Sequence, residues 1–508
     1  MEERQENERP HEDLRSRQRD FLKLSRRGDI SSAVHSNRFG AEEAALGQQI
    51  DFVITHLEAY RDEKLKQNIL LWLQIKPEPE KMDEFLSLVE DLRVEANHFG
   101  LIGLRKLLVK NPVDQVQFII DHNSLSKIMQ HARNDSYPHL VLEAAWCIAN
   151  LCMGTSQQLD FLIQKNIIPL LLEVSRSKYP QISEQALWGL GNIACDSPAT
   201  RRKIISSDAM AALREIYERG AQNLCKLVCW IFSSVCKHRE KDEPIRTLQI
   251  PIRTLVEEID KKENVNVADL SDCFVGLRSC VKKENLLVFE KSTEFLPKLV
   301  AFFREALEDP EKFSVGLTAS IFIFGGLTNA DSMFSERLIG LGVLTDLKKC
   351  LLGELSLKIQ KDICWVISNI VLSTEEAVKA FLSEPGLLEA VFRIADSAPY
   401  ELRREACWII CNLSKAKNQA IHFELIGKGF FEMISNALDR GELEETLALE
   451  AIYAQLVFFH RTNSHKELIN LMAQKGVVER LAKRQESQDI SIYYLAKKIL
   501  TKFFDLEL

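Results

Sequence analysis

Tryptophan and asparagine recur together in this sequence at a spacing that suits recognition of an extended, cationic ligand. Asn150 follows Trp146 by four residues, and Asn192 follows Trp188 by four. Residues i and i+4 share one face of a helix, so each indole is expected to project beside its amide. An indole face attracts a Lys or Arg side chain by about 0.5–2 kcal/mol. Because the amide offers a donor and an acceptor to a peptide main chain, the pairs indicate a binding site for basic peptides.

The same pair returns down the chain at a nearly constant period. The step from Trp146 to Trp188 is as long as the step from Trp188 to Trp230. Five of the six tryptophans belong to this series, which we call the Trp–Asn ladder. Its later steps are Phe274 with Arg278, Phe322 with Gly326, Trp365 with Asn369 and Trp408 with Asn412. A period of about 40 residues is typical of a stacked helical repeat.

Length and composition favour a helical array over one compact core. A single core rarely grows beyond roughly 250–300 residues, and this chain has 508. The apolar fraction of 46% and the low counts of Gly (21) and Pro (14) favour packed helices. Segment 166–207 shows the expected unit, with a helix that 166–169 open and that has Pro169 in its first turn, another from Ile182 to Cys195, and a stop at 196–198. The sequence thus predicts an all-α fold of about ten units.

The charge distribution argues for a basic ligand and against nucleic acid. Net charge is −8, whereas general nucleic-acid binding needs a basic surface. Residues 15–27 nevertheless hold six basic residues and one acidic residue. An acidic body with a locally basic tail suggests that the tail imitates the ligand. The longest apolar stretches are shorter than roughly 20 residues and no apolar leader opens the chain, so neither a membrane span nor a signal peptide is expected.

Three regions are expected along the chain. Residues 1–40 form a flexible basic arm, for which a solvated disordered tail and a functional segment both stay open. Residues 41–81 form extra capping helices and a Pro-rich linker, which would cover the first core face of an array. Residues 82–508 form the repeat array.

Chemistry of other kinds finds little support in the sequence. Cys225, Cys229, Cys236 and His238 lie along one helix and fit no usual zinc spacing, so core thiols are the preferred interpretation. Most of the twelve Cys lie in apolar helical runs, which suits reduced thiols. There is no phosphate-binding Gly-rich loop and no nucleophile with a base, so no cofactor, metal or enzymatic activity is expected.

Three segments of the chain resemble the importin alpha (karyopherin alpha) family of armadillo-repeat nuclear import adaptors. They are 143–156, 184–198 and the closing segment 492–504. The resemblance covers about 82–508. It implies a right-handed superhelical armadillo solenoid in which the third helix of each unit lines a concave groove. It also implies binding of basic nuclear localisation signals, partnership with importin beta and the family's nuclear export receptor, and shuttling between cytoplasm and nucleus. The alternative is an armadillo scaffold of the same ancestry that no longer carries this cargo.

The resemblance also implies roles for individual residues. The major peptide site in the second to fourth repeats maps onto Trp146, Asn150, Gly154, Gln185, Trp188, Asn192, Asp196 and Trp230. The minor site in the seventh and eighth repeats maps onto Trp365, Ser368, Asn369, Glu405, Trp408 and Asn412. The importin beta segment maps onto Arg15, Arg17, Arg19, Lys23, Arg26 and Arg27.

Departures from the family pattern gather in the middle of the ladder. They are Ser234, Phe274, Arg278, Phe322 and Gly326, and Leu159 is a further departure outside the middle. A cation such as Arg278 is unfavourable in a groove that receives cations. We therefore expect two competent ends, an altered middle, and either a narrower choice of ligands or weaker cooperation between the two sites.

Overall fold

A computed structural model describes most of the chain from residue 76 onward. The described residues are 52, 55–56, 68–69, 71–73, 76–110, 112–237, 244–440, 442–462 and 464–504. The arm 1–40, with Arg15, Arg17, Arg19, Lys23, Arg26 and Arg27, lies outside them, as does most of 41–75. The chain divides into two compact units, Met1–Asn192 and Ile193–Leu508, and each is considered by itself.

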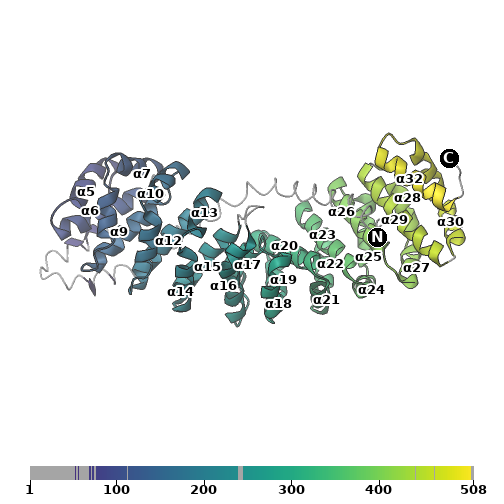
Figure 1. The fold of residues 1–508 in the computed structure, drawn as a ribbon, viewed down its shortest axis with the longest axis horizontal. Helices are drawn as coiled ribbons and strands as arrows, with labels where there is room; N and C mark the ends of the chain where they lie inside the picture. The colour runs from purple at the N-terminus through teal and green to yellow at the C-terminus, as the bar shows by residue number, and fades with distance from the viewer. Residues whose placement is uncertain are drawn as a thin grey trace. The chain divides into compact units, whose positions relative to one another are not determined.

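Every regular element in these described ranges is a helix (Figure 1). Up to the division between the units they are η1 (Pro79–Lys81), α5 (Met82–Val89), α6 (Val94–Lys110), α7 (Pro112–Asp121), α8 (Leu125–His131), α9 (Pro138–Leu151), α10 (Ser156–Gln164), α11 (Ile167–Val174) and α12 (Pro180–Asp196). Helix α12 matches the helix predicted from Ile182 to Cys195.

The second unit continues the same sequence of helices. They are α13 (Pro198–Ile205), α14 (Ala209–Glu218), α15 (Gln222–Lys237), η2 (Ile245–Leu248), α16 (Gln249–Lys261), α17 (Val267–Leu277), η3 (Lys283–Asn285), α18 (Leu286–Lys291), α19 (Phe295–Glu308), α20 (Ser314–Ala330), α21 (Ser332–Gly340), α22 (Val343–Leu352), α23 (Leu357–Ser373), α24 (Glu375–Ser383), α25 (Leu387–Ser397), α26 (Tyr400–Leu413), α27 (Gln419–Gly427), α28 (Phe430–Ala437), α29 (Glu442–Arg461), α30 (His465–Gln474), α31 (Val477–Lys483), η4 (Arg484–Glu486) and α32 (Ile490–Phe503).

The described helices fall into repeats of a short first helix, a second helix and a long third helix. Nine such groups follow the pair α5 and α6, which gives about ten repeats within the described residues. Third helices of consecutive repeats pack on one another, as α6 does on α9, α15 on α17, and α23 on α26. The predicted all-α armadillo solenoid of about ten repeats is confirmed, and the superhelical course of the whole array stays a prediction.

The turn before the second helix of a repeat needs an unusual backbone conformation. Gly386, Gly429 and Gly476 precede α25, α28 and α31 with φ of 78°, 98° and 73°. Most side chains avoid this left-handed region, but Gly enters it freely and Asn tolerates it. Asn166 takes the same place before α11 with φ of 63°. The turn residues therefore set where each second helix begins.

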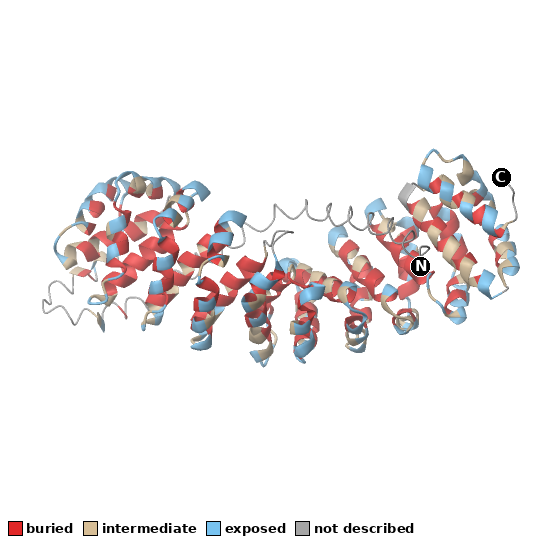
Figure 2. Cartoon of the chain, viewed as in Figure 1, coloured by how far each residue is buried: buried red, intermediate tan, exposed pale blue. Residues whose placement is uncertain are grey.

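Buried residues lie on the helix sides that face neighbouring helices, and exposed residues gather at helix ends and loops (Figure 2). In the described part of the chain no helix is both long and apolar enough to cross a membrane. All twelve cysteines are unpaired; Cys195 and Cys225 are half-buried and the rest are buried. Burial raises the pKa of the Cys407 thiol to about 12. The interpretation as core thiols is confirmed for Cys229 and Cys236, whereas Cys225 is only half-buried.

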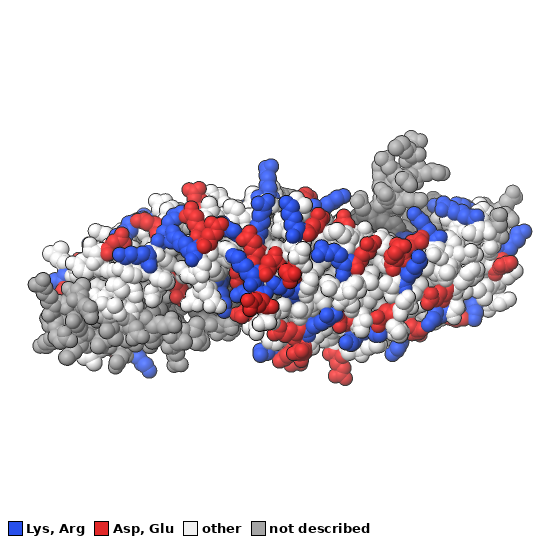
Figure 3. Space-filling model, turned by 90° about the horizontal axis from the view of Figure 1, so that it is seen from below, with Lys and Arg blue, Asp and Glu red and all other residues white. Residues whose placement is uncertain are grey.

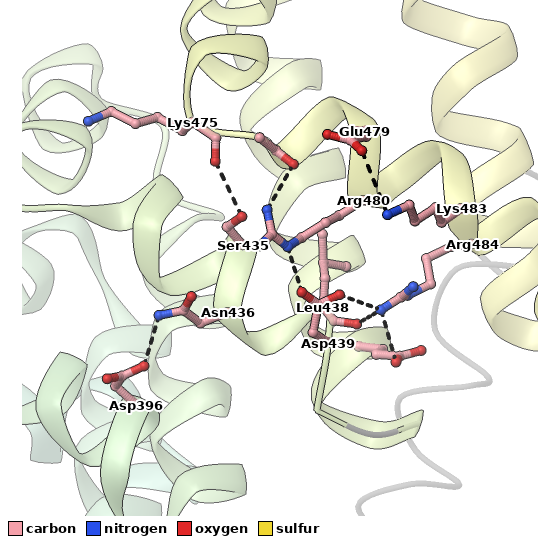
Figure 4. A network of polar contacts seen from close by, with 12 residues as sticks. Asp396, Ser435, Asn436, Leu438, Asp439, Lys475, Glu479, Arg480, Lys483 and Arg484 are labelled. Carbon is pink, nitrogen blue, oxygen red and sulfur yellow. Dashed lines mark hydrogen bonds and ion pairs between the residues drawn. The ribbon is translucent and has the colours of Figure 1, made fainter.

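Charged side chains of both signs are interspersed over the face seen in Figure 3. Many form ion pairs between consecutive repeats, as in the network of Figure 4. The carboxylate of Asp439 pairs with Nε of Arg480 at 2.6 Å and with Nη2 of Arg484 at 3.1 Å. The side-chain nitrogen of Asn436 donates a hydrogen bond to the carboxylate of Asp396 at 2.9 Å. Exposed pairs of this kind contribute about 0–1 kcal/mol each. Their recurrence at repeat spacing helps fix how one repeat sits on the next.

Candidate functional site

The ladder tryptophans all lie on third helices, but they differ in exposure. Trp146 is on α9 and Trp188 on α12. Trp230, Trp365 and Trp408 are on α15, α23 and α26 of the second unit. Trp188, Trp230 and Trp365 are half-buried, whereas Trp146 is 7% exposed and Trp408 is 5% exposed. Three of the five indoles therefore keep a substantial surface for a ligand.

The ladder asparagines join consecutive third helices. The side-chain nitrogen of Asn192 donates to the Ala149 carbonyl at 3.0 Å, and that of Asn369 donates to the Gly325 carbonyl at 3.1 Å. Asn150 and Asn412 donate in the same way to the carbonyls of Arg105 and Ser368, at 3.0 Å and 3.1 Å. The amides thus have a structural partner without any ligand, so their burial alone does not demand one. Asn192 is half-buried, whereas Asn150, Asn369 and Asn412 are buried.

Acidic groups accompany the tryptophans of the first unit. The indole of Trp188 forms a hydrogen bond with the carboxylate of Glu184; burial raises the pKa of Glu184, and this bond opposes the rise. On α9, Glu143 accepts a hydrogen bond from Arg105 at 2.5 Å. The guanidinium carbon of Arg105 lies 3.8 Å from the centre of the Trp146 ring system. A resident cation is therefore stacked on the first indole of the ladder.

The other expected major-site residues occupy varied surroundings. Gln185 is buried and Asn192 is half-buried. Asp196, the last residue of α12, is exposed, which suits contact with a cation. At Gly154 a Cβ atom would approach the Gln158 side-chain oxygen to 2.6 Å. Because that oxygen accepts from the backbone of Thr155 in the capping box of α10, Gly154 has a local structural reason to be glycine.

The expected minor-site residues lie on α23 and α26, and α23 also contacts α20. Trp365 lies so close to Gly325 that a Cβ added there would overlap the indole. Its ring centre is 5.9 Å from that of half-buried Phe322. The Ser368 hydroxyl accepts from Asn412 at 3.0 Å. The remaining expected residue, Glu405, is buried and accepts from Arg404 at 3.1 Å.

The structure corrects the ladder at its fourth step. Phe274 is fully buried, with its ring centre 4.4 Å from that of Phe302, so it packs in the core and offers no aromatic surface to a ligand. Gly276 approaches the Ser233 backbone as Gly189 approaches that of Ala149. This correspondence puts Val275 at the position that Trp188 holds in its own repeat.

The side chains around this step differ from the rest of the ladder as expected. Ser234 donates to the Trp230 carbonyl of its own helix at 2.9 Å. Burial and the neighbouring Arg278 lower the pKa of Lys237, so two cations lie close together here. Of the other departures, Leu159 is fully buried in α10. The middle of the ladder thus lacks both an aromatic plate and an amide, and it carries positive charge.

Sequence reasoning missed the charged neighbours of the tryptophans. Arg105, Glu143, Glu184 and Asp362 lie on third helices, and all but Glu184 are buried. An available signal was the acidic residue three or four positions before a ladder Trp, on an otherwise apolar helix. Arg105 gave no such signal, because it belongs to the repeat before that of the indole that it covers.

Comparison with known proteins points to one kind of protein. The Armadillo/beta-catenin-like repeat family matches residues 155–195. Importin subunit alpha-2 of Caenorhabditis elegans is 26% identical over 272 residues, which cover 52% of this chain and 49% of the relative. Importin subunit alpha-6 of Arabidopsis thaliana is 30% identical over 155 residues, covering 30% of this chain and 28% of the relative.

A third relative and a solved structure extend this comparison. Importin subunit alpha-1b of Oryza sativa subsp. japonica is 24% identical over 262 residues, covering 51% of this chain and 47% of the relative. The matches thus span about half or less of these relatives. The crystal structure of an engineered protein superposes with a TM-score of 0.67 at 16% identity, covering 84% of this chain and 99% of that one. This last likeness concerns the fold alone.

Proposed function

Because this chain is an importin-alpha-like armadillo-repeat protein, we propose that it is a nuclear import adaptor. In this proposal, third helices bind the basic nuclear localisation signals of cargo proteins. The major site comprises Trp146, Asn150, Gly154, Gln185, Trp188, Asn192, Asp196 and Trp230. The minor site comprises Trp365, Ser368, Asn369, Glu405, Trp408 and Asn412.

The observation that carries the proposal is that half-buried indoles lie on third helices in both units. Trp188, Trp230 and Trp365 each expose part of a flat aromatic side chain, on which the aliphatic stem and charged head of Lys or Arg can lie. Exposed Asp196 supplies a counter-charge. No bond is made or broken in such recognition, so the proposed role is binding.

The adaptor proposal extends to the arm and to further partners. Residues 15–27 provide the basic segment that would bind importin beta, and the family's nuclear export receptor would return the chain to the cytoplasm. The protein would then shuttle between the two compartments. An intramolecular role of the arm, in which it occupies the cargo site, follows from the same basic composition.

Titration of a fluorescent monopartite basic peptide into the full chain tests the proposed major site. Trp188→Ala removes one aromatic plate and Asp196→Lys reverses one charge, so each should weaken binding at least tenfold. Asp160→Lys, also at an exposed helical position, is the control for added charge and should bind as the wild type does. Unchanged affinity in both site variants would refute the proposed site.

The altered middle of the ladder favours one second candidate, a scaffold of the same ancestry. Buried Phe274 and the neighbouring cations Lys237 and Arg278 remove a stretch of the surface that would accept a long basic ligand. A scaffold would bind neither a basic peptide nor importin beta. Capture of purified importin beta by residues 1–40, together with peptide binding by the full chain, would exclude the scaffold. Failure of both would exclude the adaptor.

A further inference from the structure

One position of the third helix makes the same backbone hydrogen bond in several repeats. Its side chain is small in most of them but large at the start of the array. Its backbone carbonyl accepts the hydrogen bond from the ladder asparagine of the next repeat. Ala149 holds this position in α9, Gly325 in α20 and Ser368 in α23. These are small residues, and at Gly325 any Cβ would meet the next indole. In α6 the position is held by Arg105.

The side chain of Arg105 makes the contacts that a basic ligand would make. Its guanidinium carbon lies 3.8 Å from the centre of the Trp146 rings, and its Nε donates to Glu143 at 2.5 Å. Arg105 is 5% exposed and Glu143 is 1% exposed. A cation stacked on an indole and paired with a carboxylate has both attractions that the ladder offers to a ligand. This first indole is therefore already occupied.

We propose that Arg105 is a built-in occupant of the Trp146 face and ends the cation-binding series at this end of the ladder. The inference rests on the proposed binding of basic peptides. A ligand cation has no access to the face that Arg105 covers, and Glu143 is neutralised by the same side chain. Arg105 is the more exposed member of this pair, so a ligand residue that extends past Trp146 meets the cationic end of the pair, which disfavours Lys or Arg there and favours an acidic residue.

In this proposal Arg105 determines which peptides bind, whereas a purely structural arginine would not. A structural arginine would change stability and the affinity for every peptide alike. An occupant of the Trp146 face changes the order of preference among peptides that differ in one charge. The ratio of two dissociation constants separates these roles.

The experiment uses one basic core peptide, extended by a single Arg or a single Glu at either terminus. The full-length wild type should bind the Glu-extended form about tenfold more tightly than the Arg-extended form at one terminus and show no preference at the other. Arg105→Ala should abolish or reverse that preference, because the Glu143 carboxylate is then open to the ligand. Arg105→Lys, which keeps the charge, should retain it. An identical ratio in Arg105→Ala and the wild type would overturn the inference.

Arg105→Ala leaves the buried carboxylate of Glu143 without its cation and can fail to fold for that reason. A second variant keeps the test decisive in that case. Arg105→Met combined with Glu143→Met removes both charges at similar volume. In this double variant the ratio of the affinity for the Glu-extended peptide to the affinity for the Arg-extended peptide should fall to about one. A ratio in the double variant equal to that of the wild type would overturn the inference. If the wild type binds the core peptide without any preference, this inference alone fails. If it does not bind the core peptide, the proposed function fails as well.

Discussion

At the scale of the single residue, two buried histidines affect the stability of the fold. His98 and His139 are fully buried with ring centres 4.8 Å apart. Burial is the main cause that lowers the pKa of His139 to about 4, and it lowers the pKa of His98 as well. Both rings are therefore neutral in the folded chain at neutral pH.

This pair makes stability depend on pH in a defined direction. An unfolded histidine takes up a proton near pH 6.5, whereas folded His139 does so only near pH 4. The unfolded state therefore binds more protons in this window, and stability falls as the pH drops from about 6.5 to 4. One histidine accounts for about 3 kcal/mol at the lower limit. Denaturant unfolding at pH 7 and pH 5 measures the loss, and His139→Leu should reduce it; an unchanged loss would contradict the assignment.

At the scale of the element, the third helices approach so closely that one methyl group matters. Gly325→Ala would place a Cβ on top of the Trp365 indole, which must then shift. Overpacking of this kind costs about 1–3 kcal/mol. Gly340→Ala is the matched control, because nothing lies within 4 Å of its Cβ and helix propensity favours alanine. Chemical denaturation should show a loss for the first variant alone, and equal stability of the two would show that the indole does not fix the spacing of α20 and α23.

The end of α17 is the element that we expect to limit ligand choice. Arg278 lies beside Lys237 and adds positive charge at the altered step of the ladder. Arg278→Tyr should therefore raise the affinity for a bipartite basic peptide several-fold, since it removes one repulsive charge and adds an aromatic surface. Its affinity for a monopartite peptide at the major site serves as the internal control and should stay constant. No gain for the bipartite peptide in a titration would count against this explanation.

The sequence predicted the elements better than it predicted the surroundings of each side chain. The regular spacing of the tryptophans was enough to predict the repeat, the third helices and the residues that they carry. It could not distinguish Phe274 from Val275, because neighbouring positions point about 100° apart around a helix and only packing decides between them. It also could not show that Arg105 covers Trp146, since this contact joins different repeats.

For the whole molecule, the basic segment 15–27 and the negative net charge of the chain lead to a prediction about self-inhibition. If residues 15–27 imitate a basic ligand, deletion of 1–40 should raise the affinity for a monopartite basic peptide several-fold. A matched chain keeps the arm but replaces Arg15, Arg17, Arg19, Lys23, Arg26 and Arg27 with Gln, and it should behave as the deletion does. Equal affinity in the full and shortened chains would show that the arm does not compete for the site.

The central claim is that third helices carry the binding site, and mapping of a bound basic peptide tests it most directly. A monopartite peptide with a photoreactive lysine analogue is crosslinked to the full-length protein, and the crosslinked residues are identified by mass spectrometry. The claim predicts crosslinks on α12 and α15, near Trp188 and Trp230, which unlabelled peptide suppresses by competition. Competed crosslinks confined to first or second helices, such as α11 or α14, would contradict it.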